Sequence, residues 1–396
     1  MSANPSFDFH ALQVRSVRPD TPEAVIVSFE LPPALREAFA FTQGQYLTLR
    51  AQIDGQDLRR SYSICAGVDD GELRVGVRRV RGGVFSNWIH GSLRAGDRIQ
   101  VMVPQGRFFT PIEPAARRHH VGIAGGSGIT PILSIMKTVL AREPRSRFTL
   151  IYANRQIAST MFKEELEDLK NRHLARLTLH HVFSEEQTDV PLNHGVMGRE
   201  KLGEFLQALV PARGIDQAYI CGPFQMNDEA EAALQAAGVP AERIHIERFG
   251  IAQAAVNAAT ATSVAGIATV ARGSAAAPAG PQAAGTNPPH GGAGIANNAN
   301  NAITARVVLV RDGLTREIAL SPAQPDILTA AAAAGIELPF SCTSGVCGTC
   351  RARLLEGEVD MARNFALDAR ELAAGFVLVC QARPRSARVV LSFDAR

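Results

Sequence analysis

Residues Cys342–Cys350 read CTSGVCGTC, and their spacing indicates what the C-terminal part of the chain is built around. Its three cysteines have the spacing C-x4-C-x2-C, and a fourth, Cys380, follows later. Thiolates with this spacing hold a 2Fe-2S cluster of the plant type. Gly345 and Gly348 give the loop the freedom to turn sharply around a small cluster. We therefore expect four cluster ligands: Cys342, Cys347, Cys350 and Cys380.

A zinc site and unrelated buried thiols are the alternatives for these cysteines. Zinc sites favour paired C-x2-C motifs, and this stretch contains one such pair, with Cys380 alone. The N-terminus lacks the apolar stretch of a secretory signal, so we expect a cytoplasmic protein without disulfides. Metal binding is then the better interpretation of the cysteines, and an exposed cluster of this type carries single electrons.

The residues before the cysteines predict a small domain over 304–396, for which we expect an α+β fold of the β-grasp type. Strands are expected at 306–311 and 316–320, joined by the turn Asp312-Gly313. Pro325-Asp326 then begins a short helix that ends at Gly335. The preceding segment, 251–303, is rich in Ala, Gly, Asn and Pro, and we expect a flexible linker, with an Ala-rich helix as the alternative.

Residues 113–250 alternate between strand-like and helix-like runs, which predicts a parallel sheet with helices on both faces. The expected strands are 121–124, 148–153, 177–183, 218–221 and 244–247. The expected helices are 131–141, 160–170, 199–209 and 224–237. Ligands bind such a domain at the carboxyl ends of the strands.

A glycine-rich loop follows the first of these strands. The sequence AGGSGITP, residues 124–131, ends a strand and begins a helix, where backbone N–H groups and the helix dipole favour a phosphate. Pro131 takes the third glycine position of the G-x-G-x-x-G pattern, so the match to that pattern is incomplete. A later strand ends in CGPFQM, where the small thiol of Cys221 could lie beside a nicotinamide ring. A buried structural cysteine is the alternative. We expect nucleotide binding by Gly125, Gly126, Gly128, Thr130, Cys221, Gly222, Pro223 and Met226.

Residues 7–112 contain short strands separated by turns, which predicts an antiparallel Greek-key β-barrel. The expected strands are 24–31, 46–50, 73–80 and 98–103. One strand carries RSYS, residues 60–63, and GGVFS follows at 82–86. An Arg can hold a phosphate, a Tyr can stack on a flavin, and glycine N–H groups can receive a pyrophosphate. We expect flavin binding by Arg60, Ser61, Tyr62, Ser63, Gly82, Gly83 and Ser86.

In this order, the motifs resemble the ferredoxin–NADP reductase superfamily. The resemblance covers nearly the whole chain except the linker. Within the superfamily, the stretches RSYSIC, GGVFSNW, AGGSGITPILSIM, CGPFQMND and IHIERF are similar to the reductase components of phenylacetyl-CoA epoxidase complexes. The resemblance implies an electron path from NADPH to FAD, to the 2Fe-2S cluster, and to a di-iron oxygenase that oxidises phenylacetyl-CoA. NADH in place of NADPH, and FMN in place of FAD, are the alternatives.

The resemblance also assigns roles to individual residues. Arg60, Tyr62 and Ser63 would hold FAD, with Gly83 and Ser86 near its phosphates. Thr130 would lie near both flavin and nicotinamide, and Phe249 resembles the aromatic residue that packs near the flavin in relatives. Arg155 could pair with the 2′-phosphate of NADPH, with a solvated surface arginine as the alternative. The expected reactive positions are thus Ser63, Thr130, Cys221 and Phe249.

Composition limits the other classes of function. A net charge of +3 spread along the chain predicts neither a nucleic-acid nor a membrane partner. Hydride transfer between two stacked rings needs no acid–base dyad, which suits a chain without an obvious catalytic triad. Two other functions stay open: a reductase serving a Rieske dioxygenase or a soluble di-iron hydroxylase, and a bare iron–sulfur electron carrier.

Overall fold

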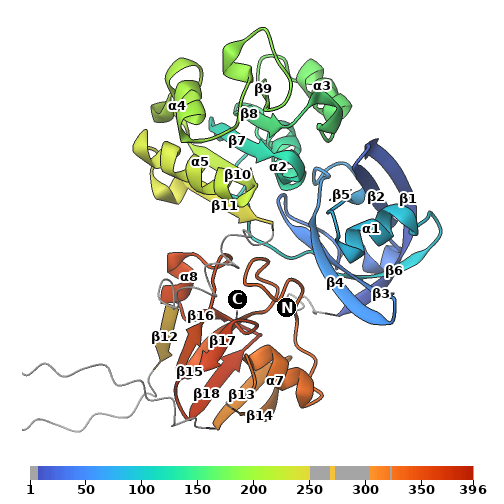
Figure 1. Cartoon of the computed structure of the whole chain (residues 1–396), viewed down its shortest axis with the longest axis vertical. Coiled ribbons are helices and arrows are strands. Elements are labelled where there is room, and N and C mark those ends of the chain that lie inside the picture. The colour runs from blue at the N-terminus through green and yellow to red at the C-terminus, as the bar shows by residue number, and fades with distance from the viewer. Residues whose placement is uncertain (1–7, 250–267, 273–303, 322, 396) are drawn as a thin grey trace, which may run out of the picture. The chain divides into compact units, whose positions relative to one another are not determined.

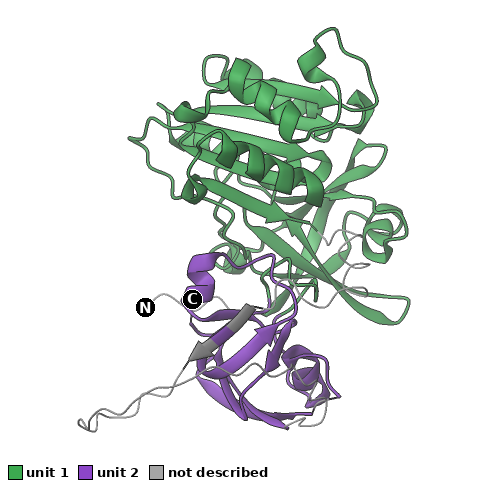
Figure 2. Ribbon diagram, turned by 60° about the vertical axis from the view of Figure 1, so that its left-hand side comes forward, with its two compact units in different colours: residues 1–263, 340–349 green, residues 264–339, 350–396 purple. Residues whose placement is uncertain are grey.

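The computed structural model describes residues 8–249, 268–272, 304–321 and 323–395. They belong to two compact units, coloured separately in Figure 2. Unit 1 comprises described residues within 1–263 and the loop 340–349. Unit 2 comprises described residues within 264–339 and 350–396. The cysteine loop is therefore divided, because Cys342 and Cys347 belong to unit 1 whereas Cys350 and Cys380 belong to unit 2.

The first part of unit 1 is a six-stranded antiparallel sheet that curls into a barrel (Figure 1). Its order is β4-β3-β6-β1-β2-β5. The end strands meet where Ile64 pairs with Val75 and where the N–H of Cys65 donates to the carbonyl of Arg74 over 3.1 Å. The strands are β1 (Phe9–Thr21), β2 (Ala24–Glu30), β3 (Tyr46–Ile53), β4 (Gln56–Ser63), β5 (Leu73–Arg78) and β6 (Arg98–Met102), with helix α1 (Val84–Gly91) after β5. The predicted antiparallel barrel is confirmed.

The second part of unit 1 is the predicted parallel sheet, and its five strands lie in the order β11-β10-β7-β8-β9. One buried cluster contains apolar side chains of α2 and α3, and another contains those of α4 and α5, so helices cover both faces of the sheet. The strands are β7 (His119–Gly125), β8 (Arg147–Asn154), β9 (Leu177–Phe183), β10 (Gln217–Gly222) and β11 (Ile244–Arg248). The helices are α2 (Ile129–Arg142), α3 (Lys163–Arg172), α4 (Arg199–Ala208) and α5 (Phe224–Ala236).

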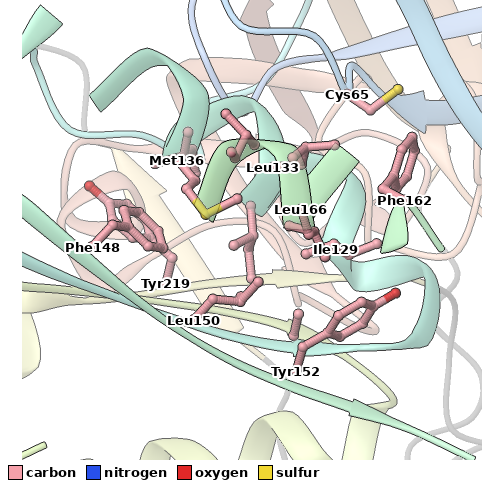
Figure 3. Close-up of a cluster of buried hydrophobic side chains, with 14 of the residues drawn as sticks. Cys65, Ile129, Leu133, Met136, Phe148, Leu150, Tyr152, Phe162, Leu166 and Tyr219 are labelled. Carbon is pink, nitrogen blue, oxygen red and sulfur yellow. The ribbon is translucent and has the colours of Figure 1, made fainter. Parts of the chain in front are cut away.

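One core cluster joins the barrel to the parallel sheet (Figure 3). Leu133 and Met136 of α2 pack in it with Tyr219 of β10, and Cys65 of the barrel belongs to the same cluster. All four side chains are at most 1% exposed. Burying an apolar side chain of this size contributes about 1.5–3 kcal/mol, so the shared cluster holds the two parts of unit 1 together.

Unit 2 is built on a sheet whose main path is β12-β15-β18-β13-β14. The predicted hairpin is confirmed: Asp312 and Gly313 both have positive φ, 53° and 72°, as a tight two-residue turn requires. Asp326 caps the following helix by accepting from the N–H of Thr329 over 2.8 Å. The elements are β13 (Ala305–Arg311), β14 (Leu314–Leu320), α7 (Ile327–Ala333), β15 (Arg351–Met361), α8 (Ala369–Ala373), β16 (Phe376–Leu378), β17 (Ala382–Pro384) and β18 (Arg388–Ser392).

Two sequence-based expectations need correction. Strand β12 (Ala268–Arg272) lies inside the expected linker 251–303 and pairs antiparallel with β15, with Val270 buried in the pair. The β-branched side chain of Val270 suits a strand despite the Ala-rich surroundings. The rest of that linker lies outside the described residues. Helix α3 begins at Lys163, not Thr160, because Phe162 adopts a left-handed φ of 58°.

Crossing a membrane requires a long and continuously apolar helix. Within the described ranges, no helix is both long enough and apolar enough to do so.

Candidate functional site

The loops predicted to bind nucleotide lie at one edge of the parallel sheet. Ala124 of β7 pairs with Cys221 of β10, and Cys221 pairs with Glu247 of β11. The three strands run in the same direction, so the glycine-rich loop, the CGP loop and the end of β11 emerge together. This is the edge at which such sheets bind ligands.

Three of the glycines at this edge allow the two loops to pack closely. A Cβ at Gly128 would overlap the carbonyl oxygen of Cys221. A Cβ at Gly125 would lie 2.6 Å from Pro223 Cδ, and one at Gly222 would collide with Met226. Close packing of one loop against the other therefore requires glycine at these positions. The predicted phosphate contact of Gly125 and Gly128 stays a prediction.

Gly126 is different from these three glycines. It has a left-handed φ of 51°, and a Cβ there would lie 2.9 Å from Nη1 of Arg78, at the end of barrel strand β5. Its carbonyl accepts a hydrogen bond from the Tyr152 hydroxyl at 3.0 Å. The glycine-rich loop thus has a barrel guanidinium beside it, which the sequence did not reveal.

Ser63, Glu247 and Cys221 form the polar centre of the site. The Ser63 hydroxyl, at the end of β4, donates to Glu247 Oε2 over 3.2 Å. Burial raises the pKa of Glu247 to about 8, although the Ser63 hydrogen bond lowers it. Burial also raises the pKa of the Cys221 thiol, and the nearby Glu247 carboxylate raises it further. At neutral pH the site therefore holds a neutral thiol and a largely protonated carboxyl group beside a serine hydroxyl.

Thr130 lies where the parallel-sheet domain meets the barrel. Its hydroxyl donates to the carbonyl of Ser127 over 2.9 Å, and its side chain is 2% exposed. A Cβ at Gly76 of β5 would lie 2.8 Å from Thr130 Cγ2, so Gly76 allows this close approach. The structure therefore places Thr130 between the part predicted to bind flavin and the part predicted to bind nucleotide.

The residues predicted to hold flavin lie along β4 and around the start of α1. The Arg60 side chain is exposed and donates to the carbonyl of Arg59 over 2.7 Å. The Tyr62 ring packs at a tilt against Phe85, with centroids 6.2 Å apart. Burial raises the pKa of the Tyr62 hydroxyl, so this group stays protonated at any ordinary pH. The Tyr62 residue as a whole is half-buried, which leaves part of its side chain open to a stacking partner.

The GGVFS segment makes a sharp turn into α1. Gly82 has a left-handed φ of 73°, and Gly83 is the residue that precedes the helix. The hydroxyl of Ser86, which is 5% exposed, accepts from the N–H of Val80 over 3.1 Å. This hydroxyl thus stabilises the turn, and its predicted contact with a phosphate stays a prediction. Backbone N–H groups at a helix start, together with an arginine, are donors that suit a pyrophosphate.

Two predicted residues lie apart from this centre. Phe249 follows β11 and is 41% exposed. Arg155 follows β8, and its guanidinium Nη2 donates to Glu23 Oε2 of the barrel over 3.2 Å. Both residues follow strands at the edge of the sheet that carries the site. Their predicted roles beside the flavin and the nucleotide stay predictions.

The four cysteines predicted to bind the cluster occur as two pairs, one in each unit. In unit 1, the sulfur of Cys342 accepts from the N–H groups of Ser344 and Cys347 over 3.4 and 3.3 Å. The Cys347 side chain and these N–H groups lower the pKa of the Cys342 thiol to about 4. In unit 2, the sulfurs of Cys350 and Cys380 lie 3.1 Å apart.

The arrangement of these cysteines in two pairs indicates which metal group they suit. Each iron of a two-iron cluster takes two protein ligands, so close pairs of thiols suit such a cluster. Among the residues that the structure describes, no group of three or more His, Cys, Asp or Glu side chains is gathered for a metal ion. The two pairs of thiols supply the donor atoms that a 2Fe-2S cluster takes.

The part of the cysteine loop in unit 1 is hydrogen-bonded to the barrel. The Tyr46 hydroxyl donates to the carbonyl of Cys347 over 2.6 Å and lies 2.9 Å from the Thr349 hydroxyl. Ser61 donates to Ser341 over 2.9 Å. Tyr46 of β3 is paired with Ser63 of β4 in the antiparallel sheet. Tyr46 therefore connects the Ser63–Glu247 centre to the cysteine loop.

Four residues of this site were not predicted from the sequence: Glu23, Tyr46, Arg78 and Glu247. A carboxylate at the end of a buried parallel strand, as in IHIE, was a usable signal for Glu247. No local pattern points to Tyr46 or Glu23, because their roles depend on contacts with residues far away in the sequence.

Comparisons with known proteins agree with this arrangement. Residues 13–110 match the family model for an oxidoreductase FAD-binding domain, and residues 123–232 match an oxidoreductase NAD-binding domain. Residues 309–385 match a 2Fe-2S iron-sulfur cluster binding domain. The matched ranges fall within the three predicted domains.

Whole-chain relatives are also found. The chain is 41% identical to one subunit of the 1,2-phenylacetyl-CoA epoxidase of Escherichia coli, over 98% of both chains. It is 30% identical to the ferredoxin reductase component of the 3-ketosteroid-9-alpha-monooxygenase of Rhodococcus rhodochrous, over 96% of both. Among solved structures, phthalate dioxygenase reductase is similar over 97% of this chain and 98% of that one, with 25% identity and a TM-score of 0.53.

Proposed function

Because the chain belongs to the family of oxygenase reductase components that combine FAD-binding, NAD-binding and 2Fe-2S domains, we propose that it delivers electrons from NADPH to a di-iron oxygenase. When bound, FAD accepts the two electrons of a hydride and passes them on singly to the 2Fe-2S cluster. The chain itself binds the cofactors, orients them and controls protons near the flavin.

The observation that carries this proposal is the hydrogen bond between Ser63 and Glu247. Ser63 lies at the end of the barrel strand proposed to bind flavin, and Glu247 lies beside Cys221 at the nucleotide edge of the sheet. The pair is therefore where a flavin ring and a nicotinamide ring would meet. With a pKa of about 8, Glu247 can exchange a proton near neutral pH, and Ser63 Oγ can relay it.

The other residues around this pair hold the two rings and keep water out. We assign Arg60 and Tyr62 to the flavin, with Gly83 and Ser86 near its phosphates. Gly126 and the start of α2 would receive a phosphate of the nucleotide. Thr130 and Cys221, at most 2% exposed, present small side chains that leave space for hydride transfer.

We assign the cluster to Cys342, Cys347, Cys350 and Cys380. The N–H groups around Cys342 favour its thiolate, which is the form that binds iron. The Tyr46 hydroxyl holds the backbone of Cys347 against strand β3, and β3 pairs with the strand that contains Ser63. This attachment would bring one side of the cluster loop next to the flavin domain.

The proposed partner is a di-iron oxygenase that acts on phenylacetyl-CoA. The support is the 41% identity, along nearly the entire chain, to a subunit of 1,2-phenylacetyl-CoA epoxidase. Oxidation of the substrate would then take place on the partner, because the motifs found in this chain all serve cofactors.

The proposed nucleotide is NADPH. Arg155 and Arg78 together offer two guanidinium groups near the glycine-rich loop, which suits a nucleotide with an extra phosphate. NADH would use the same ring site without the 2′-phosphate.

The visible spectrum of the purified protein, recorded without oxygen, tests the proposal. Flavin and iron–sulfur bands that bleach on addition of NADPH, and more slowly with NADH, are the expected result. Iron–sulfur bands without flavin, or bands that neither nucleotide changes, would contradict it and favour a bare electron carrier.

A second candidate function is electron supply to another oxygenase, such as a Rieske dioxygenase or a soluble di-iron hydroxylase. The similarity to a 3-ketosteroid-9-alpha-monooxygenase reductase component favours it. Reconstitution separates the candidates: the purified protein should support phenylacetyl-CoA epoxidation with the matching oxygenase faster than it supports the oxygenases of the alternative systems.

A further inference from the structure

The carboxylate of Glu23 lies between two arginines that come from different parts of unit 1. Glu23 is in the turn between β1 and β2, and its Oε2 accepts from Arg78 Nη2 at 2.9 Å and Nε at 3.3 Å. The same oxygen accepts from Arg155 Nη2 at 3.2 Å. One barrel carboxylate therefore bridges a barrel arginine and an arginine of the parallel-sheet domain.

Both arginines border the proposed nucleotide site. Arg78 Nη1 lies 2.9 Å from where a Cβ of Gly126 would be, so its guanidinium is directly beside the glycine-rich loop. Arg155 follows Asn154, the last residue of β8, at the same carboxyl edge of the sheet. Two guanidinium groups near the glycine-rich loop form an anion-binding site. In this structure the Glu23 carboxylate is the anion bound there.

The ion pairs of Glu23 with Arg78 and Arg155 can be broken by a competing anion at little cost in stability. The Glu23 side chain is 50% exposed, and those of Arg78 and Arg155 are 32% and 51% exposed. Exposed ion pairs contribute little to stability, so exchange of one anion for another costs little. Hydrogen bonding and charge from Arg78, followed by the charge of Arg155, lower the pKa of Glu23, so it is ionised at neutral pH.

We propose that Glu23 is an internal competitor for the nucleotide: it binds Arg78 and Arg155 at the position that a nucleotide phosphate would take, and the phosphate displaces it. This inference rests on the proposed nucleotide site. A phosphate carries more negative charge and more acceptor oxygens than a carboxylate, so it wins the exchange. Glu23 thereby sets how tightly the nucleotide binds without contacting the reacting rings.

The test replaces Glu23 by Gln, which keeps the shape and an acceptor oxygen but removes the charge. Isothermal titration calorimetry on the full chain, loaded with flavin and cluster, measures the Kd values of NADP+ and NAD+. We expect Glu23→Gln to lower the Kd of NADP+ by about threefold to tenfold, because no carboxylate has to be displaced.

The matched control is Asp69→Asn. Asp69 bonds Arg142 at 2.8 and 2.6 Å, and this pair also joins the barrel to the parallel-sheet domain, with exposed fractions of 51% and 50%. The control removes the same unit of charge from a similarly exposed bridge that is not beside the glycine-rich loop. It should leave both Kd values unchanged.

The two nucleotides identify the phosphate. If Glu23→Gln tightens the binding of NADP+ alone, the proposal is supported and the 2′-phosphate is the group that displaces Glu23. If it tightens the binding of NAD+ equally, the proposal is supported and the pyrophosphate is that group. Unchanged or weaker binding in Glu23→Gln, or equal tightening in Asp69→Asn, overturns it. Failure of the wild-type protein to bind either nucleotide would overturn the proposed function itself, and this inference with it.

Discussion

Ser63 donates a hydrogen bond to Glu247 Oε2 over 3.2 Å, and this contact joins the last residue of β4 to strand β11 of the parallel sheet. The bond spans two domains, because its partners are 184 positions apart in the sequence. It places a hydroxyl and a carboxyl group of raised pKa beside Cys221, at the point where hydride transfer is proposed to occur.

Replacing Ser63 by Ala tests whether this hydroxyl serves the reaction. Hydride transfer depends on how closely the two rings are held, so losing a hydroxyl that positions the flavin should slow flavin reduction by NADPH at least about tenfold in anaerobic stopped-flow measurements. Ser16→Ala is the control, because the Ser16 hydroxyl bonds a neighbouring barrel strand, at Ser28 Oγ. Equal rates in the two variants would remove Ser63 from the proposed mechanism.

The raised pKa of Glu247 predicts a pH-dependent stability. The folded chain holds this proton up to a pH of about 8, whereas an ordinary Glu releases it near 4.5. Stability from this group is therefore full below about pH 4.5, falls as the pH rises, and levels off above about 8. In Glu247→Gln this loss is absent, so the melting temperature of the variant relative to wild type should rise between about pH 5.5 and 8.5.

Thermal unfolding of both proteins at several pH values measures this difference. Cofactor content has to be equal in the two samples, because bound cofactors shift the melting temperature. A difference in melting temperature that stays constant with pH would mean that Glu247 titrates normally.

Gly128 is predicted to tolerate no larger residue. A Cβ there would overlap the carbonyl oxygen of Cys221, which is backbone and cannot move aside as a side chain can. We expect Gly128→Ala to destabilise the protein by about 3 kcal/mol or to prevent nucleotide binding. Gly203→Ala in α4 is the control, since nothing lies within 4 Å of its added Cβ; it should stabilise by about 0.5–1 kcal/mol. Chemical unfolding curves that rank the two variants equally would refute the packing argument.

The edge of the parallel sheet could be predicted from the sequence for a physical reason. Strands β7 and β10 are short apolar runs that end in glycine motifs, and parallel strands bring their carboxyl ends together. The loops after Ala124 and Cys221 therefore had to meet, and they do. The hairpin at Asp312-Gly313 could also be predicted from the sequence, because Asp and Gly are residue types that tolerate the positive φ of a two-residue turn.

The parts that were missed depend on contacts that no local pattern encodes. Tyr46 lies in an ordinary barrel strand, and its role appears only through the carbonyl of Cys347, 301 positions later. Glu23 lies in a turn and meets Arg155 only when the two domains of unit 1 pack. Strand β12 was missed because a short strand in an Ala-rich segment carries too weak a pattern before its pairing with β15 is known.

Cys350→Ser separates the cluster from the flavin. Cys350 and Cys380 form the close thiol pair of unit 2, so losing one sulfur should prevent cluster binding at that pair. We expect the variant to lose reduction of cytochrome c and of the oxygenase, and to keep most of its ferricyanide reduction, because the flavin can reduce ferricyanide directly. Cys65→Ala is the control: it removes a buried cysteine from the barrel instead, and should keep both activities. If ferricyanide reduction also disappeared from Cys350→Ser while flavin and structure were retained, electrons would have to pass through the cluster first, and the proposed order of carriers would be wrong.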